Sequence, residues 1–251
     1  MLYIVGTPIG NLEDISLRAL RILGEVDFIL CEDTRVTRKL LEHYKIKTPV
    51  ISYHQYSDFS KTDYILDLLG QGKDLALVSD AGTPGISDPG GKLVQAVSEK
   101  FGEDMKIESV PGPSAVTAAL SISGIPTDKF IFMGFPPHKK GRQTFLKKII
   151  ESSYPVVVYE SKHRIIKFLE ELNRISHLSA GALAEEDIAN LESQVEKDKK
   201  QKEIKLTSIV VCRELSKMHE TIYRGKMEDI INKIKDSRDD QKGEFVVIIG
   251  K

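Results

Sequence analysis

A dense group of ionisable residues follows one of the apolar runs of the sequence. The run covers residues 156–159, and directly after it come Glu160, Ser161, Lys162, His163 and Arg164. A carboxylate or an imidazole can move a proton during a reaction, and two cations can hold a phosphate backbone. The group therefore indicates acid–base chemistry on an anionic substrate. The start of a solvated helix would have a similar composition.

Two smaller polar groups follow other apolar runs. Glu32, Asp33 and Arg35 come after residues 26–31, and Arg213 and Glu214 come directly after Cys212. The carboxylates at 32 and 33 could serve the same chemistry or could cap the helix that follows.

Three loops are rich in glycine and proline, at residues 6–11, 79–91 and 110–115. Without bulky side chains, such loops let backbone N–H and C=O groups reach a flat polar ligand. The first loop lacks the G-x-G-x-x-G pattern, and Pro8 has no N–H to offer a phosphate, so a pyrophosphate site is disfavoured. Each loop alone could be turn chemistry, but three at one sheet edge favour a ligand cleft.

A basic stretch begins behind Phe135. It contains His138, Lys139, Lys140 and Arg142, and Lys147 and Lys148 follow it. A positive loop of this kind can contact phosphates, although basic loops also occur on proteins that bind no nucleic acid.

The elements that must position these groups alternate along the chain, as in parallel sheets with crossover helices, which predicts an α/β fold. Strands are expected at 2–5, 26–30, 50–52, 75–79, 107–110, 130–133, 156–159, 206–212, 221–223 and 244–249. Helices are expected at 16–23, 34–43, 58–69, 93–100, 115–123, 144–150, 165–174 and 227–235. Ligands of open parallel sheets bind beyond the carboxyl ends of the strands, where the groups above lie.

Turn residues at 123–127 predict a boundary between two domains, residues 1–123 and 124–251. One segment departs from the alternation. Residues 185–205 are strongly charged and contain neither glycine nor proline. They indicate a solvated excursion, with a partner-binding arm as the alternative.

Composition limits the class of protein further. The 36 basic residues nearly cancel the 37 acidic ones, so any binding of nucleic acid must come from a local patch. Cys31 and Cys212 both lie in apolar runs, which indicates reduced core thiols, a cytoplasmic location and no metal cluster. No run approaches the roughly 20 apolar residues that a membrane helix requires.

Several runs together resemble the tetrapyrrole methylase family, and within it the ribosomal RNA methyltransferases. The resemblance covers nearly the whole chain. The motifs that carry it are residues 4–12, 32–35, 78–90 (VSDAGTPGISDPG), 110–115 (VPGPSA), 134–135, 140–142, 159–161, 163–164, 213–215 and 242–245. Lys162 stands where family members usually have proline, residues 185–205 look like an insertion, and some relatives carry an additional C-terminal segment.

The resemblance implies two α/β domains of the tetrapyrrole methylase type, with S-adenosylmethionine in a cleft between them, and a homodimer. The implied reaction is methyl transfer to the ribose 2′-hydroxyl of a decoding-centre cytidine in 16S rRNA of the small ribosomal subunit. By the same resemblance the cofactor would be bound by Pro8, Ser79, Asp80, Ala81, Gly82, Ser114, Ala115, Phe135 and Cys212.

The implied reaction needs a base for the hydroxyl proton and cations for the phosphates. Glu160 and His163 are the first candidates for the base, and Asp33 and Glu214 the next. The expected RNA contacts are Arg35, Lys139, Lys140, Arg142, Arg164 and Arg213.

Three alternatives remain at this point. The first keeps the cofactor and methylates a carbon of a tetrapyrrole precursor. The second is a non-catalytic RNA-binding assembly factor on the same fold. The third, a nicotinamide-dependent oxidoreductase, is weakened by the absence of G-x-G-x-x-G.

Overall fold

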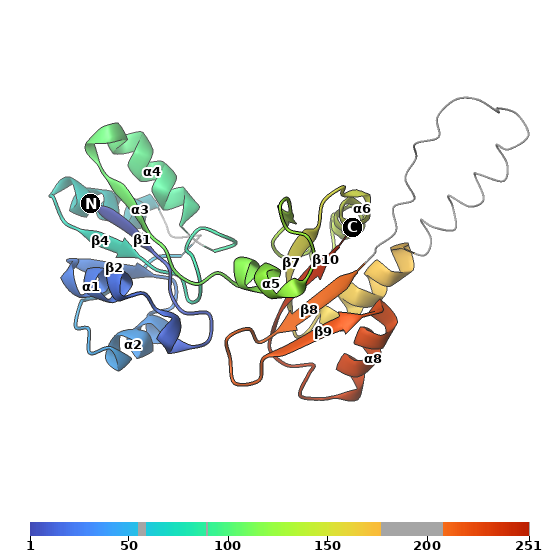
Figure 1. Cartoon of the computed structure of the whole chain (residues 1–251). Coiled ribbons are helices and arrows are strands. Elements are labelled where there is room, and N and C mark those ends of the chain that lie inside the picture. The colour runs from blue at the N-terminus through green and yellow to red at the C-terminus, as the bar shows by residue number, and fades with distance from the viewer. Residues whose placement is uncertain (55–58, 89, 177–207, 251) are drawn as a thin grey trace, which may run out of the picture. The chain divides into compact units, whose positions relative to one another are not determined.

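The computed structural model describes residues 1–54, 59–88, 90–176 and 208–250 (Figure 1). Two compact units make up the chain, Met1–Ala115 and Val116–Lys251. Helix α5 (Ala115–Ser123) joins the second unit, whereas the sequence placed the boundary at the other end of this helix. The charged segment expected at residues 185–205 lies outside the described residues.

The first unit is built on a five-stranded parallel sheet in the order β3-β2-β4-β1-β5. Its strands are β1 (Leu2–Val5), β2 (Phe28–Cys31), β3 (Val50–Ser52), β4 (Leu75–Leu77) and β5 (Ile107–Val110). Because all of these strands run in one direction, the loops that follow them leave from the same edge of the sheet.

Helices cover both faces of this sheet. They are α1 (Leu17–Glu25), α2 (Thr34–His43), α3 (Phe59–Gly70) and α4 (Gly91–Phe101), with short 3-10 turns at Leu12–Asp14 and Gly102–Asp104. Successive side chains of a strand point to opposite faces. Ile29 accordingly packs in the core that includes residues of α1 and α2, and Leu30 packs in the core that includes residues of α3 and α4.

The second unit contains a mixed sheet in the order β6-β7-β10-β8-β9. Its strands are β6 (Ile131–Phe132), β7 (Val156–Ser161), β8 (Ile209–Arg213), β9 (Thr221–Gly225) and β10 (Glu244–Ile249). Only the β6–β7 pair is parallel. The expectation of parallel sheets throughout is therefore wrong here. Residues 214–220 are too few for a parallel crossover, which needs about a dozen residues or more.

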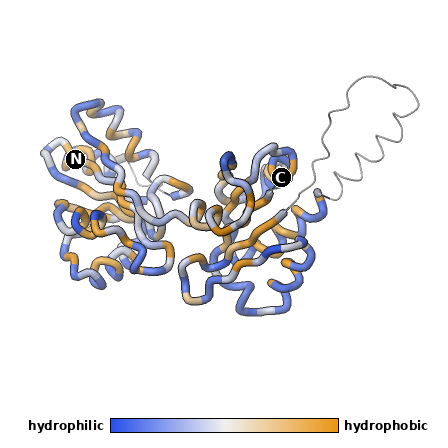
Figure 2. Tube along the Cα trace, viewed as in Figure 1, coloured by the Kyte–Doolittle hydropathy of each residue, from blue (hydrophilic) through white to orange (hydrophobic). Residues whose placement is uncertain are grey.

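One hydrophobic core lies on one face of this mixed sheet. It joins α6 (Arg142–Glu151), the helical residues 165–176 and α8 (Met227–Asp236) to alternate residues of the strands. Phe168 and Phe245 are its largest fully buried side chains. Figure 2 shows the corresponding pattern, with hydrophobic strands and hydrophilic outer turns of the helices.

The topology of the second sheet gathers several motifs at one edge. Strands β7 and β8 are both antiparallel to β10, so their carboxyl ends lie on either side of its first residues. Ser161 pairs with Glu244, and Arg213 pairs with Phe245. Because β6 is parallel to β7, the Gly134–Phe135 motif leaves from this edge as well.

Candidate functional site

The loops after β1 and β4 are tied to each other by their backbones. The N–H of Thr7 donates to the carbonyl of Gly82 at 2.9 Å, and the N–H of Gly82 donates back to Thr7 at 3.1 Å. The buried hydroxyl of Thr7 also donates to the carbonyl of Ser79 at 3.2 Å. The glycine-rich loops at residues 6–11 and 79–91 are therefore joined by hydrogen bonds.

The loop after β5 touches the loop after β1 backbone to backbone. A Cβ atom built on Gly112 would lie 2.7 Å from the carbonyl oxygen of Gly6, and one built on Gly6 would lie 2.8 Å from the Cα atom of Gly112. This approach is possible only between two glycines. The third loop, which carries Ser114 and Ala115, is thereby held against the first.

The expected cofactor residues of this unit differ in how they can take part. Pro8, Ser79 and Gly82 are buried, and Asp80 and Ala81 are exposed. The hydroxyl of Ser79 donates to the carbonyl of Ala81 at 3.2 Å, so it shapes the loop from within. Of the exposed residues, Asp80 offers a carboxylate and Ala81 has no polar side-chain atom.

Carboxylates gather at this edge of the first sheet. The side chain of Asp80 accepts from the N–H of Asp33 at 3.2 Å. Burial raises the pKa of Asp88 to about 6, the negative charges of Glu32 and Asp80 act in the same direction, and a hydrogen bond with Ser79 opposes them. A concentration of negative charge disfavours a pyrophosphate and favours a cationic ligand.

Sequence reasoning did not single out Asp88, although it lies within the VSDAGTPGISDPG run. It follows a stretch rich in glycine and proline and directly precedes Pro89. These neighbours show no hydrophobic periodicity that would predict that Asp88 is half-buried. The raised pKa of Asp88 arises chiefly from burial, to which the charge of the more distant Glu32 and that of Asp80 in the same run add.

Replacing Asp88 by asparagine should stabilise the protein at neutral pH and not in acid. The folded state raises this pKa, so it binds the proton more tightly than the unfolded chain, and the wild type loses stability as pH rises from about 4 to about 6. Asparagine does not ionise. The difference in melting temperature between variant and wild type should therefore grow between about pH 4 and about pH 8. An equal difference at both pH values would contradict this environment for Asp88.

In the second unit the carboxylate of Glu160 lies in the interior. Its side chain is fully buried, with Nε of Arg164 at 2.8 Å and Nη1 of Arg142 at 4.0 Å. Burial raises the pKa of Glu160, while the N–H of Ser161 and the two guanidinium groups oppose that rise. A carboxylate enclosed in this way holds other side chains in place.

The two arginines beside Glu160 hold the loop that follows β6. Nη1 of Arg164 donates to the carbonyl of Pro136 at 3.0 Å, and Nη1 of Arg142 donates to the carbonyl of Pro137 at 3.1 Å. Nε of Arg142 also donates to Glu171 at 2.6 Å. In this structure both guanidinium groups are engaged with carbonyl and carboxylate groups of the protein itself.

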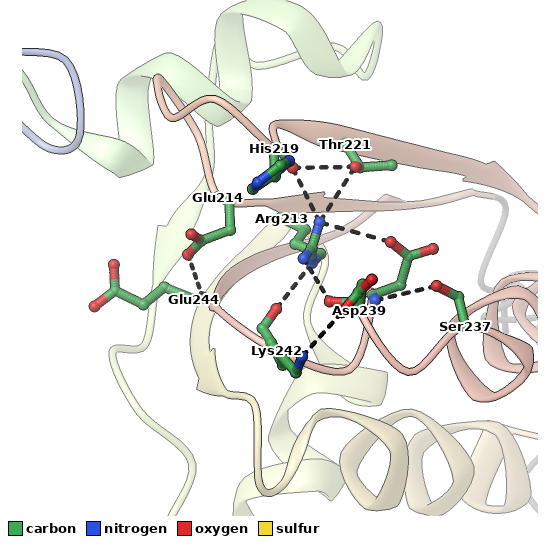
Figure 3. A network of polar contacts seen from close by, with 9 residues as sticks. Arg213, Glu214, His219, Thr221, Ser237, Asp239, Lys242 and Glu244 are labelled. Atoms are coloured by element: carbon green, nitrogen blue, oxygen red, sulfur yellow. Dashed lines mark hydrogen bonds and ion pairs between the residues drawn. The ribbon is translucent and has the colours of Figure 1, made fainter.

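Arg213 is a third arginine turned into the protein, and Figure 3 shows its surroundings. It is 5% exposed and donates to the carbonyls of Lys242 at 2.8 Å, His219 at 3.0 Å and Asp239 at 2.5 Å. The carboxylate of Asp240 lies 3.6 Å from its Nη1. Arg213 therefore joins the chain segments around β8, β9 and β10.

Glu214 completes the same junction (Figure 3). Its carboxylate accepts from the N–H of Glu244 and from Nζ of Lys217, both at 2.9 Å. Burial alone would raise the pKa of Glu214, but these hydrogen bonds lower it below its ordinary value. Gly243 leaves room for the side chain, since a Cβ there would lie 2.5 Å from Cγ of Glu214. A carboxylate satisfied in this way is a weak base.

The remaining base candidates separate by exposure. Asp33 caps α2, and the hydrogen bonds from Arg35 hold its pKa well below the usual range. His163 lies exposed in the turn after β7. Among Glu160, His163, Asp33 and Glu214, only the histidine is exposed.

The two cofactor residues expected from the second unit differ in exposure. Cys212 is fully buried in β8, and burial raises the pKa of its thiol to about 11, so it is a core residue. Phe135 is 51% exposed. Of the expected RNA contacts, Arg35, Lys139 and Lys140 are exposed.

A pocket of about 590 Å³ lies at the opposite edge of the second sheet, where β8 begins and β9 ends. Its lining includes Ser208, Ile209, Arg224 and Gly225, and none of the expected site residues. Within the described parts of the chain no group of histidine, cysteine and carboxylate side chains could hold a metal ion. No described helix is long and apolar enough to cross a bilayer.

Comparison with known proteins identifies the class. The family model of the tetrapyrrole (corrin/porphyrin) methylases matches residues 1–231. The fold resembles a cobalt precorrin-4 methyltransferase, with a TM-score of 0.65 and 19% identity over 99% of this chain and 94% of that one. It also resembles the uroporphyrin-III C-methyltransferase of Thermus thermophilus, with a TM-score of 0.58 and 17% identity over 100% and 94%. The chain belongs to the tetrapyrrole methylase family, as its motifs predicted.

Curated relatives are more similar in sequence. A ribosomal RNA small subunit methyltransferase I from Hydrogenobaculum sp. is 41% identical over 100% of this chain and 95% of its own length. Proteins of the same name from Thermotoga maritima and Escherichia coli O157:H7 are 39% and 37% identical over 99% of this chain, and over 97% and 77% of their own lengths.

Proposed function

We propose that this protein is an S-adenosylmethionine-dependent methyltransferase that acts on the 16S rRNA of the small ribosomal subunit, at the ribose 2′-hydroxyl of a decoding-centre cytidine. The observation that carries the proposal is the identity of 37–41%, over 99–100% of this chain, to proteins named ribosomal RNA small subunit methyltransferase I. The charged residues of the two units support the proposal. The carboxylates of the first unit suit a cationic methyl donor, and the exposed lysines of the second unit suit an anionic acceptor.

The loops of the first unit have the chemistry that this donor needs. S-adenosylmethionine carries an ammonium and a sulfonium group and no phosphate. Asp80 and Ala81 are exposed, and the carboxyl groups of Asp33 and Asp88 lie near that of Asp80. We infer that the loops at residues 6–11, 79–82 and 112–115 hold the donor, chiefly through backbone groups. When bound, the donor would supply an activated methyl group.

The exposed part of the loop after β6 suits the acceptor. Lys139 and Lys140 are exposed, and Arg142 and Arg164 hold the loop in place through the carbonyls of Pro137 and Pro136. Cations of this kind contact phosphates of a nucleic acid. A methylase of a tetrapyrrole precursor has no phosphate backbone to bind and would not need these exposed lysines. The loop therefore favours an RNA substrate over a tetrapyrrole substrate.

His163 would accept the proton of the ribose hydroxyl as the new carbon–oxygen bond forms and the methyl–sulfur bond of the donor breaks, which would leave the donor as a neutral thioether. A positioned base contributes about 10²–10⁴-fold, and correct placement of the reactants can supply about 7–11 kcal/mol of the barrier. The residues of this chain would therefore act mainly by binding and orienting the two substrates.

Changing Lys139 and Lys140 together to alanine should weaken RNA binding and flatten its dependence on salt. On single-stranded nucleic acid, each phosphate that the protein no longer neutralises reduces the slope of log K against log salt by about 0.7. The two lysines together should therefore reduce the slope by up to about 1.4. The measurement is RNA affinity at several salt concentrations.

The matched control changes Lys226 and Lys233 to alanine. Both are exposed in the same unit, and the change in net charge is equal. If the control and the test variant alter the slope alike, the effect is one of net charge and the loop does not contact RNA.

We also propose a cytoplasmic homodimer, as the family resemblance implies. Light scattering of the purified protein tests the dimer.

The reaction is tested by incubating the protein with methyl-labelled S-adenosylmethionine and small ribosomal subunits. Donor binding without transfer to any RNA would favour the assembly factor or the tetrapyrrole substrate.

A further inference from the structure

Phe135 is an exposed aromatic ring with a firm support. It follows β6 at the sheet edge where β7 and β8 also end. Its centroid lies 5.4 Å from that of Tyr159, and Tyr159 lies 4.9 Å from Phe132. The N–H of Tyr159 donates to the carbonyl of Gly134 at 3.0 Å. Half of Phe135 therefore remains open to solvent while the ring of Tyr159 packs against it.

The backbone next to Phe135 is held from below. Pro136 and Pro137 restrict the chain directly after the ring, because each proline fixes its own φ angle. Their carbonyls are the acceptors of Arg164 and Arg142. A ring presented on such a support loses little conformational entropy when a ligand stacks on it.

Positive charge follows the ring at short distance along the chain. Lys139 and Lys140 are exposed on the same loop, before α6 begins at Arg142. An exposed aromatic face beside cations is the combination with which proteins bind unpaired nucleotides, since bases stack on the ring and phosphates meet the cations. A duplex offers no free base face to such a ring.

We propose that Phe135 is a stacking platform for an unpaired base of the RNA substrate, with Lys139 and Lys140 on the adjoining phosphates. This assignment replaces the cofactor contact that the family resemblance implied for Phe135. It rests on the proposed function for the identity of the nucleic acid, and it defines the substrate as single-stranded at the bound position.

The test compares F135L with F135Y in binding to an unstructured RNA oligonucleotide that contains cytidine. Loss of one stacked base should weaken binding by about 5- to 150-fold in F135L, and F135Y should bind nearly as the wild type does. Because the ring carries no charge, the salt slope of F135L should equal that of the wild type. F130L is the control, since Phe130 is 40% exposed at the other end of β6.

Donor affinity, measured by calorimetry without RNA, separates the two assignments of Phe135. Unchanged donor affinity with weakened RNA binding supports the platform. Weakened donor binding with unchanged RNA binding would overturn it and leave the proposed reaction intact. Equal RNA affinity of F135L, F130L and wild type, or no RNA binding by the wild type, would also overturn it. If RNA binding depends on Phe135 but no ribosomal RNA is methylated, the proposed function fails and the platform stands.

Discussion

Alanine in place of Gly112 should remove most of the affinity for the methyl donor. The added Cβ would lie 2.7 Å from the carbonyl oxygen of Gly6 and 2.9 Å from its Cα atom. These are backbone atoms, so the loops after β1 and β5 must separate. Overpacking of this kind costs about 1–3 kcal/mol, and a loss of 1.4 kcal/mol in binding is about tenfold. Calorimetric titration with S-adenosylmethionine measures the loss.

The control for this variant is Gly24→Ala. Gly24 lies in α1 in the same unit, has no atom within 4 Å of its virtual Cβ, and does not require a positive φ. Alanine there should keep donor affinity and leave stability unchanged or slightly higher. If Gly112→Ala binds the donor as tightly as Gly24→Ala does, the donor does not depend on the contact between these loops.

Removal of the Arg213 side chain should destabilise the second unit severely. Three backbone carbonyls and Asp240 would lose their buried cationic partner. Breaking a buried charged network by removing one partner costs about 3–5 kcal/mol. Arg213→Ala should therefore lower the free energy of unfolding by an amount of this order, measured by denaturant unfolding.

Two further variants make the stability result specific. Arg238 is exposed and close in sequence to Asp239 and Asp240, so Arg238→Ala should change stability by no more than about 0.5 kcal/mol. Arg213→Lys keeps the charge but lacks the planar fork, and should fall between wild type and Arg213→Ala. Equal stability of Arg213→Ala and Arg238→Ala would mean that the network in Figure 3 does not stabilise the protein.

Much of the fold followed from hydrophobic periodicity. Strands β1, β3, β5 and β10 and helices α2 and α5 begin and end at the predicted residues. Alternation of strands and helices predicts parallel pairing in both sheets. This prediction is wrong for the second unit, where most strand pairs are antiparallel. The short connection 214–220 was the local signal against it.

The sequence also contained a signal that three charged residues are buried. Side chains two positions apart in a strand share a face. Val156, Val158 and Glu160 therefore lie on one face of β7, and Val211 and Arg213 share the corresponding face of β8, which is the core face.

Helical spacing gave the equivalent signal for Arg142. It lies four positions before Leu146 and seven before Ile149, so it shares the buried face of α6. The charge of these residues predicts exposure, whereas their place in the strand and helix periodicity predicts burial, and the structure follows the periodicity. Which loops meet, as at Gly6 and Gly112, depends on strand order and could not be read from local sequence.

Mapping the methylated atom tests the central claim most directly. The purified protein, methyl-labelled S-adenosylmethionine and small ribosomal subunits from a strain that lacks this activity are incubated together. The 16S rRNA is then digested and analysed by mass spectrometry. We expect label on the ribose 2′-oxygen of a decoding-centre cytidine. Label on a base, on another RNA or on no RNA at all, with demonstrable donor binding, would contradict the account.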